Sequence, residues 1–297
     1  MTLPDTQSNA TLAPRVLVLM AVYNGERWLS EQIDSVLNQV GVEVNLLISV
    51  DLSTDDSLGV CAGFADRHHN VEVLNYGVRY GSATENFSRL IAEADITGND
   101  FVAFCDQDDI WDSEKLIASV TTIANGEYAA VSSDVTAFWS DGRRRHITKS
   151  QPQQKYDYVL EAAGPGSTYV LTAPVFLAYK KWLSDRLTEE LPPHDWLLYA
   201  YCRIYGHAWF IIPESTVLYR QHADNFLGAN VGFRGRLERI RSLASGQFQR
   251  DVARLEALFG ADFPVQTSRF SLLRHWPRLR RKRLEAFVFA LLCLAFW

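Results

Sequence analysis

Apolar runs alternate with amphipathic stretches along the chain from residue 15 onward. Val16 to Val22 is the first apolar run, and apolar side chains at helical spacing follow the turn at residues 23–25. The same alternation predicts further elements: strands at 44–50, 71–74 and 101–105, and helices at 57–68 and 83–94. This order of strands and helices is typical of a parallel sheet with helices on both faces. We therefore expect an α/β fold with a mostly parallel central sheet.

The pattern becomes mixed in the second half of the chain. It predicts helices at 113–124, 175–187 and from residue 192, strands at 128–139, 166–171, 208–212 and 216–219, and a helical stretch at 234–258. We expect three parts in the chain as a whole: a disordered lead over residues 1–14, an α/β domain over residues 15–230, and a helical C-terminal extension over residues 231–297.

Three carboxylates follow the apolar run Phe101 to Cys105, at Asp106, Asp108 and Asp109. Ligands of open α/β sheets bind just beyond the carboxyl ends of such strands. Acidic side chains packed there raise each other's pKa unless a cation offsets their charge. Carboxylate oxygens suit Mg²⁺ or Mn²⁺, which commonly share phosphate oxygens. The run predicts a divalent metal site for a nucleotide, and a solvated turn is the alternative.

Composition and charge narrow the function. The chain has 297 residues, of which 47% are hydrophobic and 22% charged, as in a globular protein. Its four cysteines show no paired spacing, which argues against a disulfide framework and a zinc cluster and favours a reducing cytoplasm. Residues 1–14 lack the pattern of a signal peptide. The net charge is −6. Residues 231–297 carry 13 Lys/Arg and 5 Asp/Glu, a net charge of +8. Residues 1–230 carry the other 16 Lys/Arg and 30 Asp/Glu, a net charge of −14. The acidity of residues 1–230 argues against nucleic acid as a partner.

Five short polar motifs follow strands or open helices. They are Ala21-Val-Tyr-Asn-Gly-Glu26, Asp51-Leu-Ser-Thr-Asp-Asp-Ser57, Asp106-Gln-Asp-Asp109, His194-Asp-Trp196 and Tyr219-Arg-Gln-His222. In this order and spacing they resemble the family 2 glycosyltransferases of GT-A fold, and most closely the bacterial rhamnosyltransferase branch, over about residues 15–228. The resemblance implies an inverting transfer of a sugar from a nucleotide-sugar donor, with dTDP-rhamnose favoured and a UDP-sugar as the alternative. The implied acceptor is a glycan or lipid-linked glycan of a cell-surface polysaccharide.

The resemblance also implies roles for individual residues. Tyr23, Glu26 and Asp51 match nucleotide-binding positions, and Asp106 would lie by the ribose. Asp108 and His222 would hold Mg²⁺ or Mn²⁺ against the diphosphate, which Arg220 would also contact. Asp195 matches the catalytic base. Taken alone, each has a structural alternative, such as a turn residue or, for Asp195, a helix cap.

Four further residues are weaker candidates. Arg79 is a lesser phosphate-binding candidate, with a solvated loop cation as the alternative. Trp111, Gly166 and Trp196 are candidates for the acceptor side, because aromatic faces stack on sugars. Core packing is the alternative for each tryptophan.

One position departs from the family pattern. The family commonly reads Asp-Asp-Gly-Ser-Thr-Asp where this chain has Val50-Asp-Leu-Ser-Thr-Asp55, so one acid and the turn glycine are missing. Leu52 cannot adopt a positive φ at low cost. We therefore expect a reshaped loop, and the sequence leaves the identity of the nucleotide open.

Two other functions compete with glycosyl transfer. A metal-dependent nucleotidyltransferase would also use a nucleotide and clustered carboxylates, but no glycine-rich phosphate loop with a basic residue follows the first strand. A non-catalytic glycan-binding or nucleotide-binding relative is the third reading, and the presence of Asp195 together with the acidic motif argues against it.

The last 24 residues form a basic and apolar tail. Residues 274–283 contain six Lys/Arg, and residues 284–297 are apolar apart from Glu285. This apolar stretch is shorter than the roughly 20 residues that span a bilayer. We expect peripheral contact of residues 274–297 with the inner face of the cell membrane. A helix docked on the α/β domain is the alternative.

Overall fold

The computed structural model describes residues 13–222 and 245–297. The expected disordered lead lies almost wholly outside the described residues, as does the first part of the helix expected at 234–258.

The first half of the chain forms the parallel sheet that the sequence predicts. The strands are β1 (Arg15–Val22), β2 (Glu43–Val50), β3 (Val71–Val73) and β4 (Phe101–Asp106), and the helices between them are α1 (Glu26–Leu37), α2 (Ser57–Arg67) and α3 (Ala83–Glu93). The strands pair in parallel in the order β3-β2-β1-β4. The α/β fold is confirmed, and these boundaries agree with the predicted ones to within one or two residues.

The second half extends the same sheet with mixed strand directions. It contributes β5 (Ile110–Trp111), β6 (Ala130–Trp139), β7 (Arg144–Ile147), β8 (Val170–Thr172) and β9 (Trp209–Gln221). The full order is β3-β2-β1-β4-β8-β6-β9-β5, with β7 beside β6. β8 is antiparallel to both β4 and β6, and β9 is parallel to β6. Therefore β1, β2, β4, β6 and β9 all run in one direction, and their carboxyl ends meet at one edge of the sheet.

Two predicted strand assignments were wrong. Residues 166–168 form a 3-10 turn, and only Val170–Thr172 pair as a strand. The two strands predicted around residue 213 are a single strand, β9, whose register with β6 shifts on either side of Asp134. Pro213 lies in this stretch and has no N–H for the ladder, so the sequence there resembles a break between two strands.

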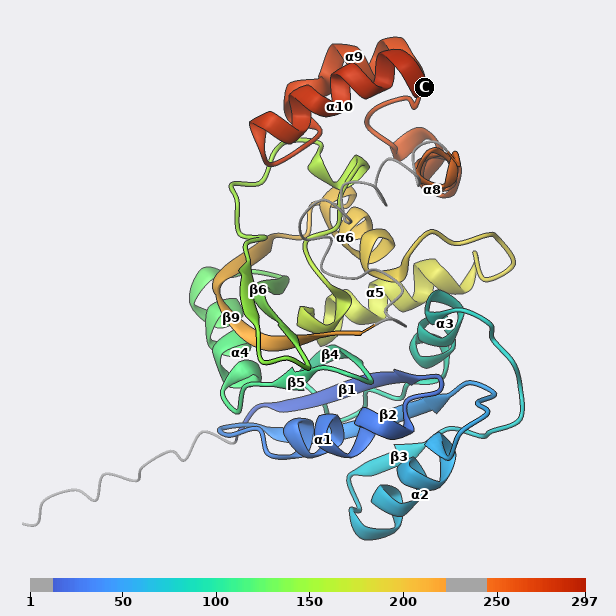
Figure 1. The fold of residues 1–297 in the computed structure, drawn as a ribbon, viewed down its shortest axis with the longest axis vertical. Helices are drawn as coiled ribbons and strands as arrows, with labels where there is room; N and C mark the ends of the chain where they lie inside the picture. Colours follow the sequence, from blue (N-terminus) through green and yellow to red (C-terminus); the bar gives the residue numbers. More distant parts are fainter. Residues whose placement is uncertain (1–12, 223–244) are drawn as a thin grey trace, which may run out of the picture.

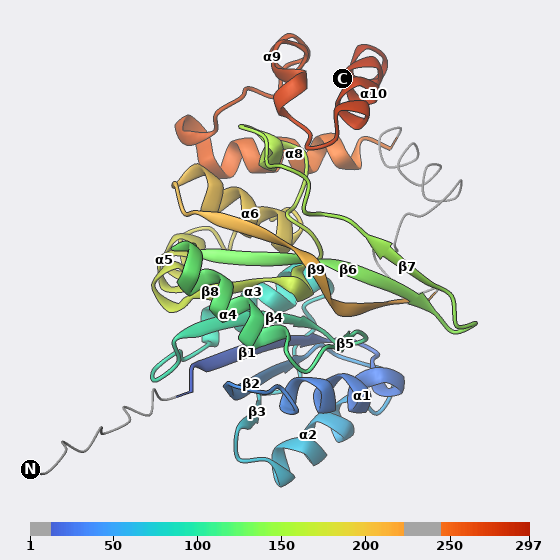
Figure 2. The same ribbon diagram turned by 90° about the vertical axis from the view of Figure 1, so that its left-hand side faces the viewer.

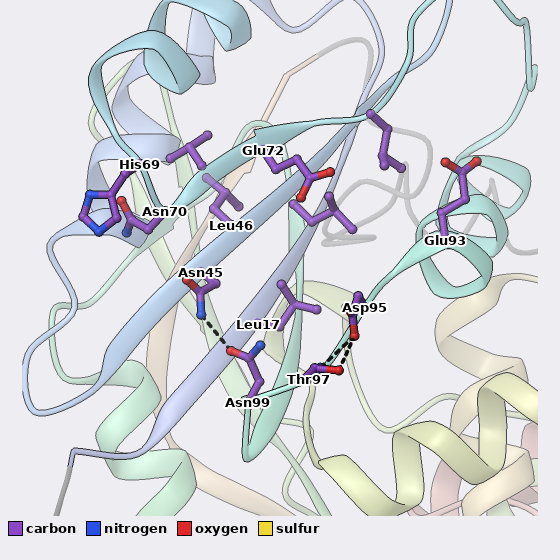
Figure 3. A pocket seen from close by; sticks show the side chains of 13 residues that line it. Leu17, Asn45, Leu46, His69, Asn70, Glu72, Glu93, Asp95, Thr97 and Asn99 are labelled. Carbon is purple, nitrogen blue, oxygen red and sulfur yellow. Dashed lines mark hydrogen bonds between the residues drawn. The ribbon is translucent and has the colours of Figure 1, made fainter.

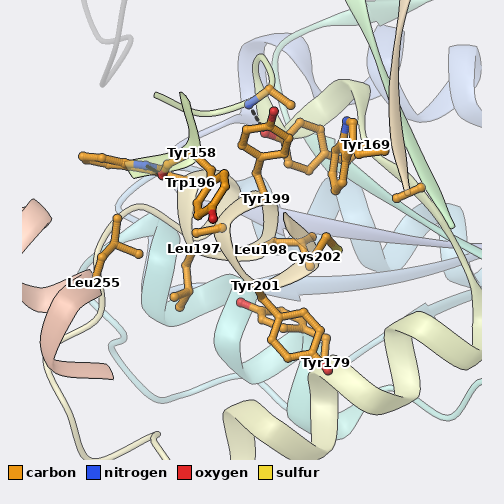
Figure 4. Packing of buried hydrophobic residues seen from close by; sticks show 14 of the residues in the cluster. Tyr158, Tyr169, Tyr179, Trp196, Leu197, Leu198, Tyr199, Tyr201, Cys202 and Leu255 are labelled. Carbon is orange, nitrogen blue, oxygen red and sulfur yellow. Dashed lines mark hydrogen bonds between the residues drawn. The ribbon is translucent and has the colours of Figure 1, made fainter. Parts of the chain in front are cut away.

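Apolar layers cover both faces of the sheet. Alternate residues of β1 point to opposite sides, with Leu17 and Leu19 in one cluster and Val16, Val18 and Met20 in the other. One layer is built on α1, α2 and α4 (Lys115–Gly126), and the other on α3, α5 (Ala173–Ser184) and α6 (His194–Ile204). Figure 4 shows α6 within the second layer, with Leu255 of the C-terminal extension on the side of Leu197 and Trp196.

The C-terminal extension packs on the α/β domain. Its helices are α8 (Gln247–Phe259), α9 (Arg269–His275) and α10 (Arg283–Phe296). They lie beyond α6, at the opposite end of the molecule from α2 (Figures 1 and 2). Leu255, Leu279 and Phe289 belong to the same buried cluster as the residues of α6. The alternative of a docked C-terminal helix therefore describes one face of the tail.

A cavity of about 350 Å³ lies at the opposite edge of the sheet from the clustered polar motifs. Leu17, Asn45 and Asn99 line it, at or beside the amino ends of β1, β2 and β4, and Asn45 donates a hydrogen bond to Asn99 (2.9 Å; Figure 3). The predicted site residues lie instead at the carboxyl edge. The candidate site is therefore defined by its side chains and not by this cavity.

Candidate active site

Hydrogen bonds fasten the loop after β1 to the loop after β2. The Asn24 N–H donates to Ser53 Oγ (3.0 Å), and Asn24 Oδ1 accepts from the Thr54 N–H (2.8 Å). Asn24 has φ = 48°, a left-handed conformation that asparagine tolerates better than most residues. Leu52 has no positive φ. The loop is thus built without the family glycine, and the left-handed residue of this corner lies in the neighbouring loop.

Tyr23 and Glu26 lie in this corner of the structure. Tyr23 exposes its ring, and its backbone N–H and C=O pair with the side-chain amide of Gln107 (2.7 and 2.8 Å). Glu26 accepts a hydrogen bond from the Asp56 N–H at the start of α2 (3.0 Å). Gln107 therefore ties the acidic loop after β4 to the end of β1, and the Tyr23 ring remains accessible to a ligand.

Asp51 is buried at the end of β2. Its carboxylate accepts three backbone hydrogen bonds, from Leu52 (2.7 Å), Tyr80 (2.8 Å) and Gly81 (2.8 Å). These bonds hold the loop before α3 against the edge of the sheet. The exposed Arg79 is adjacent to this anchored segment. In this structure Asp51 positions a loop, and Arg79 is the cation that the loop presents to solvent.

Asp109 links three distant parts of the chain. It is fully buried, and its carboxylate accepts hydrogen bonds from Ser167 Oγ (2.7 Å) and from the Arg220 N–H (3.1 Å). Burial, together with the neighbouring Asp108 and Asp106, raises the pKa of Asp109 well above its usual range. Asp109 therefore joins the acidic loop to β9 and to the 3-10 turn at residues 166–168.

Asp108 contacts His222, which follows the end of β9. Asp108 Oδ2 lies 2.7 Å from His222 Nε2, and the imidazole stacks on the Trp28 ring at 4.0 Å between centroids. Arg220 Nε donates to the Asp108 carbonyl oxygen (2.7 Å), and its guanidinium pairs with Glu31. The end of β9 thus folds over the acidic loop, and the two predicted metal ligands are in direct contact.

Asp195 lies beside Asp106. It occupies the first turn of α6, after the N-cap residue Pro193, and its carboxylate accepts the Trp196 N–H (2.7 Å). Burial raises the pKa of Asp195 to about 6. Burial and the charges of Asp108 and Asp195 raise the pKa of Asp106 to about 7. Carboxylates from the end of β4, the loop after it and the start of α6 therefore gather around Asp106 and raise its pKa.

Lys149 was not predicted, and among the described residues its charge acts on Asp195. Its charge lowers the pKa of Asp195, against the larger effect of burial. The loop that carries it is held by the buried Asp134, whose carboxylate accepts the backbone N–H groups of Lys149 (2.6 Å) and Ser150 (2.8 Å). The available sequence signal was the acid at residue 134 within an apolar strand, because a buried carboxylate needs partners.

Tyr219 was also missed as an individual site residue. Burial raises the pKa of its hydroxyl, and the charges of Asp106, Asp108, Asp109 and Asp195 raise it further. The phenol is therefore close to all four carboxylates and stays protonated, so it can donate a hydrogen bond within the site.

The two candidate tryptophans of the acceptor side are core residues. Trp111 is buried, with the Lys115 Nζ 3.6 Å from its ring centroid. Trp196 is buried as well, stacks on Phe248 of α8, and donates its indole N–H to the Tyr158 carbonyl oxygen (2.7 Å). The core-packing alternative describes both rings, and neither enters the proposal below.

Gly166 allows a close approach of the chain to the start of α6. A Cβ at this position would lie 2.5 Å from His194 Nε2 and 3.4 Å from the Asp195 Cβ. The His194 Nε2 is shielded from solvent and the ring stacks on Phe87 at 4.0 Å, so the ring has little freedom to move away. Gly166 therefore acts on the site by its lack of a side chain.

The donor set suits a hard divalent cation. Carboxylate oxygens and an imidazole nitrogen are ligands that Mg²⁺ and Mn²⁺ accept. Within residues 13–222 and 245–297 there is no group of three His, Cys, Asp or Glu residues arranged as a complete metal site. Asp108 and His222 could supply two ligands, with the others coming from phosphate oxygens and water, as is usual for Mg²⁺ at nucleotides.

Sequence comparison defines the family. Residues 17–186 match the model of glycosyl transferase family 2, so the chain belongs to that family of glycosyltransferases. The chain is 35% identical over 239 residues to the dTDP-rhamnosyl transferase RfbG of Shigella flexneri, which covers 80% of this chain and 83% of that protein. It is also 25% identical over 218 residues to the putative glycosyltransferase EpsE of Bacillus subtilis, covering 72% and 75% of the two chains.

Solved structures confirm the GT-A glycosyltransferase fold. Residues 1–349 of S. aureus TarS, in complex with UDP, have a TM-score of 0.56 and 16% identity, with 88% of this chain and 72% of that TarS fragment covered. The mannosyltransferase PcManGT from Pyrobaculum calidifontis, in complex with GDP-Man and Mn²⁺, has a TM-score of 0.53 and 15% identity, with 97% and 82% covered. At this level of identity the likeness concerns the fold alone.

Proposed function

We propose that the protein transfers L-rhamnose from dTDP-rhamnose to a hydroxyl group of a glycan or lipid-linked glycan, with inversion at the anomeric carbon. The observation that carries the proposal is the meeting of Asp195 with Asp106 and Asp108 at the carboxyl edge of the sheet. The similarity to a dTDP-rhamnosyl transferase supports the choice of donor. A UDP-sugar is the alternative donor.

Asp195 is suited to accept a proton. Its pKa of about 6 leaves the carboxylate ionised at neutral pH, yet closer to the operating pH than an ordinary aspartate, which favours general-base catalysis. In the proposed step the acceptor oxygen bonds to the anomeric carbon, the bond from that carbon to the diphosphate breaks with its electron pair, and Asp195 takes the hydroxyl proton. One direct displacement inverts the configuration, so a β-linked donor gives an α-rhamnoside.

The residues around Asp108 are suited to the departing diphosphate. Asp108 and His222 would hold Mg²⁺ or Mn²⁺, and a bound cation of this kind stabilises negative charge on phosphate oxygens. Arg220 fixes the backbone of the acidic loop through the Asp108 carbonyl. The Tyr23 ring is exposed beside this loop, to which its backbone is bonded through Gln107, and would contact the nucleotide. Asp106 would lie by the ribose.

The proposal is tested by product analysis with purified protein. Incubation with dTDP-rhamnose, Mn²⁺ and a rhamnose-accepting glycan should release dTDP and yield an α-linked product. A chelator should remove the activity, and added Mn²⁺ should restore it. Asp108→Ala should weaken donor binding with Mn²⁺ present, whereas Asp141→Ala, which removes an exposed carboxylate outside the site, should not.

The same assay separates the competing functions. Pyrophosphate formed from a nucleoside triphosphate and a sugar phosphate would identify a nucleotidyltransferase. Binding of a nucleotide sugar or glycan without any transfer or hydrolysis would identify a non-catalytic relative. Transfer from a UDP-sugar in preference to dTDP-rhamnose would retain the inverting mechanism and overturn the choice of donor. Activity that survives complete removal of divalent ions would contradict the proposed metal site.

A further inference from the structure

Helix α10 carries apolar side chains on two opposite faces. The inner face is buried against α8, α9 and the rest of the core, through Ala286, Phe289 and Cys293. The outer face is exposed and includes Leu284 (75% exposed), Phe287 (51%), Val288 (45%), Leu291 (52%) and Leu294 (57%). Residues with this spacing share one side of a helix. Single exposed apolar residues are ordinary on a protein surface, but five on one helix face form an interaction surface.

The orientation of this outer face is fixed by the chain that precedes the helix. Arg281 is buried, its guanidinium lies 3.5 Å from Asp157 and 3.6 Å from Glu161, and its N–H donates to Glu161 (2.6 Å). Leu279 is fully buried beside it. The start of α10 is therefore fastened to the α/β domain, and the outer face is held toward solvent as a part of the folded surface.

Basic side chains lie beside the apolar face. Arg274, Arg278, Lys282 and Arg283 are exposed, and among these Lys282 has an acidic neighbour, Glu285, at 3.5 Å. Trp276 packs edge-on against Phe287 at 6.2 Å, which places the basic segment around residues 276–278 next to the outer face. The chain as a whole has a net charge of −6, so this local excess of cations is specific to the region.

We propose that α10 and this basic segment, residues 274–294, bind the surface of an anionic lipid bilayer. The apolar face would enter the boundary between headgroups and acyl chains, and the arginines and lysine would meet the negative headgroups. A second protein surface would have to be both apolar and acidic to match the same features. An anionic membrane combines both properties, and charge complementarity therefore favours it over a second copy of this chain, which would bring cations against cations.

The helix would lie on the bilayer and not cross it. Its 14 residues at about 1.5 Å each reach about 21 Å, whereas the hydrocarbon core is about 30 Å thick. Among the residues that the structure describes, no helix combines the length and apolarity that a crossing needs. The exposed face alone is available to lipid, since the inner face is part of the core.

The test is co-sedimentation of the full chain with vesicles. The wild type should bind vesicles of phosphatidylcholine with 30% phosphatidylglycerol at low salt and should bind phosphatidylcholine alone at least tenfold more weakly. Phe287→Glu/Leu291→Glu should abolish the binding. Leu177→Glu, a substitution at a 50%-exposed leucine on α5, is the matched control and should bind as the wild type does. Arg274→Gln/Arg278→Gln should weaken binding about 25-fold, because each basic residue near an anionic surface contributes about a factor of five.

Circular dichroism and the melting temperature should be unchanged in these variants, since every substituted side chain is exposed. The assay needs no substrate, so its result is independent of the proposed glycosyl transfer. The proposal would be overturned if the wild type did not bind the vesicles, or if Phe287→Glu/Leu291→Glu still bound them. A stable dimer in light scattering that Phe287→Glu/Leu291→Glu converts to a monomer, without vesicle binding, would identify a second copy as the occupant and would overturn it as well.

Discussion

Asp157 beneath the C-terminal helices and Asp106 at the end of β4 are both largely removed from water, but their surroundings differ. Burial raises the pKa of Asp157, and the guanidinium groups of Arg203 (2.9 Å) and Arg281 (3.5 Å) oppose that rise. Asp106 has two further carboxylates, Asp108 and Asp195, as its charged neighbours, and the hydroxyl of Ser167 is the group that lowers its pKa.

The difference separates a structural carboxylate from those of the proposed binding site. At Asp157 the protein supplies the compensating cations, and the result is a fixed junction between the α/β domain and the C-terminal extension. At Asp106 the neighbouring charges are those of Asp108 and Asp195, and at Asp195 the charge of Lys149 opposes the effect of burial on the pKa. Such a group is costly to the folded protein unless a ligand brings positive charge. This arrangement supports the proposed cation and substrate site at Asp106, whereas the cations at Asp157 stabilise the fold.

The largest expected effect is on catalysis at Asp195. Asp195→Asn keeps the shape of the side chain but cannot take the proton, so the transfer rate should fall by roughly 10²–10⁴-fold, or about 3–5 kcal/mol in the barrier. Donor affinity should change little. Steady-state kinetics with dTDP-rhamnose, and donor titration by calorimetry, would measure both quantities. A loss of thermal stability or of donor binding with an unchanged rate constant would assign Asp195 a structural role instead.

A substitution at the Asp157 junction should lower the stability of the protein, whereas the substitution at Asp195 lowers the transfer rate. Arg281→Met leaves Asp157 buried with one arginine fewer, and the free energy of unfolding should fall by about 3 kcal/mol, the lower end of the range for broken buried pairs, because Arg203 remains. Urea unfolding would measure it. Arg274→Met, at an exposed arginine of the same segment, should stay within about 0.5 kcal/mol of the wild type. If Arg281→Met and Arg274→Met were equally stable, the ion pair of Arg281 with Asp157 would contribute no more to stability than an exposed arginine does.

The pH dependence of stability should report on the burial of Asp195. The folded pKa of Asp195, about 6, exceeds the unfolded value of 3.8, so the folded state binds more protons between these values. Its contribution is therefore present below pH 4 and is lost as the pH rises through 6, by up to about 3 kcal/mol. Asp195→Asn should match the wild type in stability near pH 4 and exceed it near pH 7, in urea unfolding without metal or donor. A variant that is less stable than the wild type at pH 7 would contradict the assignment.

A smaller effect is expected at Gly166. Gly166→Ala places a Cβ against the His194 ring, which is stacked on Phe87. The local shift should cost about 1–2 kcal/mol of stability and displace the start of α6 that carries Asp195. The melting temperature and the transfer rate should both fall. Gly63→Ala, within helix α2, should leave both unchanged or raise the stability, since alanine is the better helix former. Unchanged values for Gly166→Ala would show that the close contact with His194 is not limiting.

The junction at Asp157 also changes what removal of the tail should do. Leu279, Phe289 and Cys293 belong to the main core, so deletion of residues 274–297 should expose core surface and destabilise the protein. Point substitutions on the outer face of α10 are therefore the sharper way to test membrane contact, because they leave the junction intact.

Much of the fold follows from patterns that are local in the sequence. The apolar runs of β1, β2 and β4 and the helical spacing in α1 and α3 determine those elements, because a strand buried on both faces needs a continuous apolar run and an amphipathic helix needs one apolar stripe. The polar motifs at the strand ends were predictable for the same reason. Once the sheet is parallel, its strand ends must lie at one edge.

Tertiary structure alone decided which of these side chains act together. Lys149 reaches Asp195 through a loop anchored on Asp134, and Asp109 joins Ser167 to Arg220 across 58 and 111 residues of sequence. In the sequence Trp111 and Trp196 look like sugar-binding tryptophans beside polar motifs. Only their burial in the structure shows them to be core residues. The tail reads from sequence as either docked or interfacial, whereas in the structure one face is docked and the other is free. A local pattern records the polarity of a side chain, but its partners depend on how distant segments pack, and that packing sets the burial and the charges that each site residue meets.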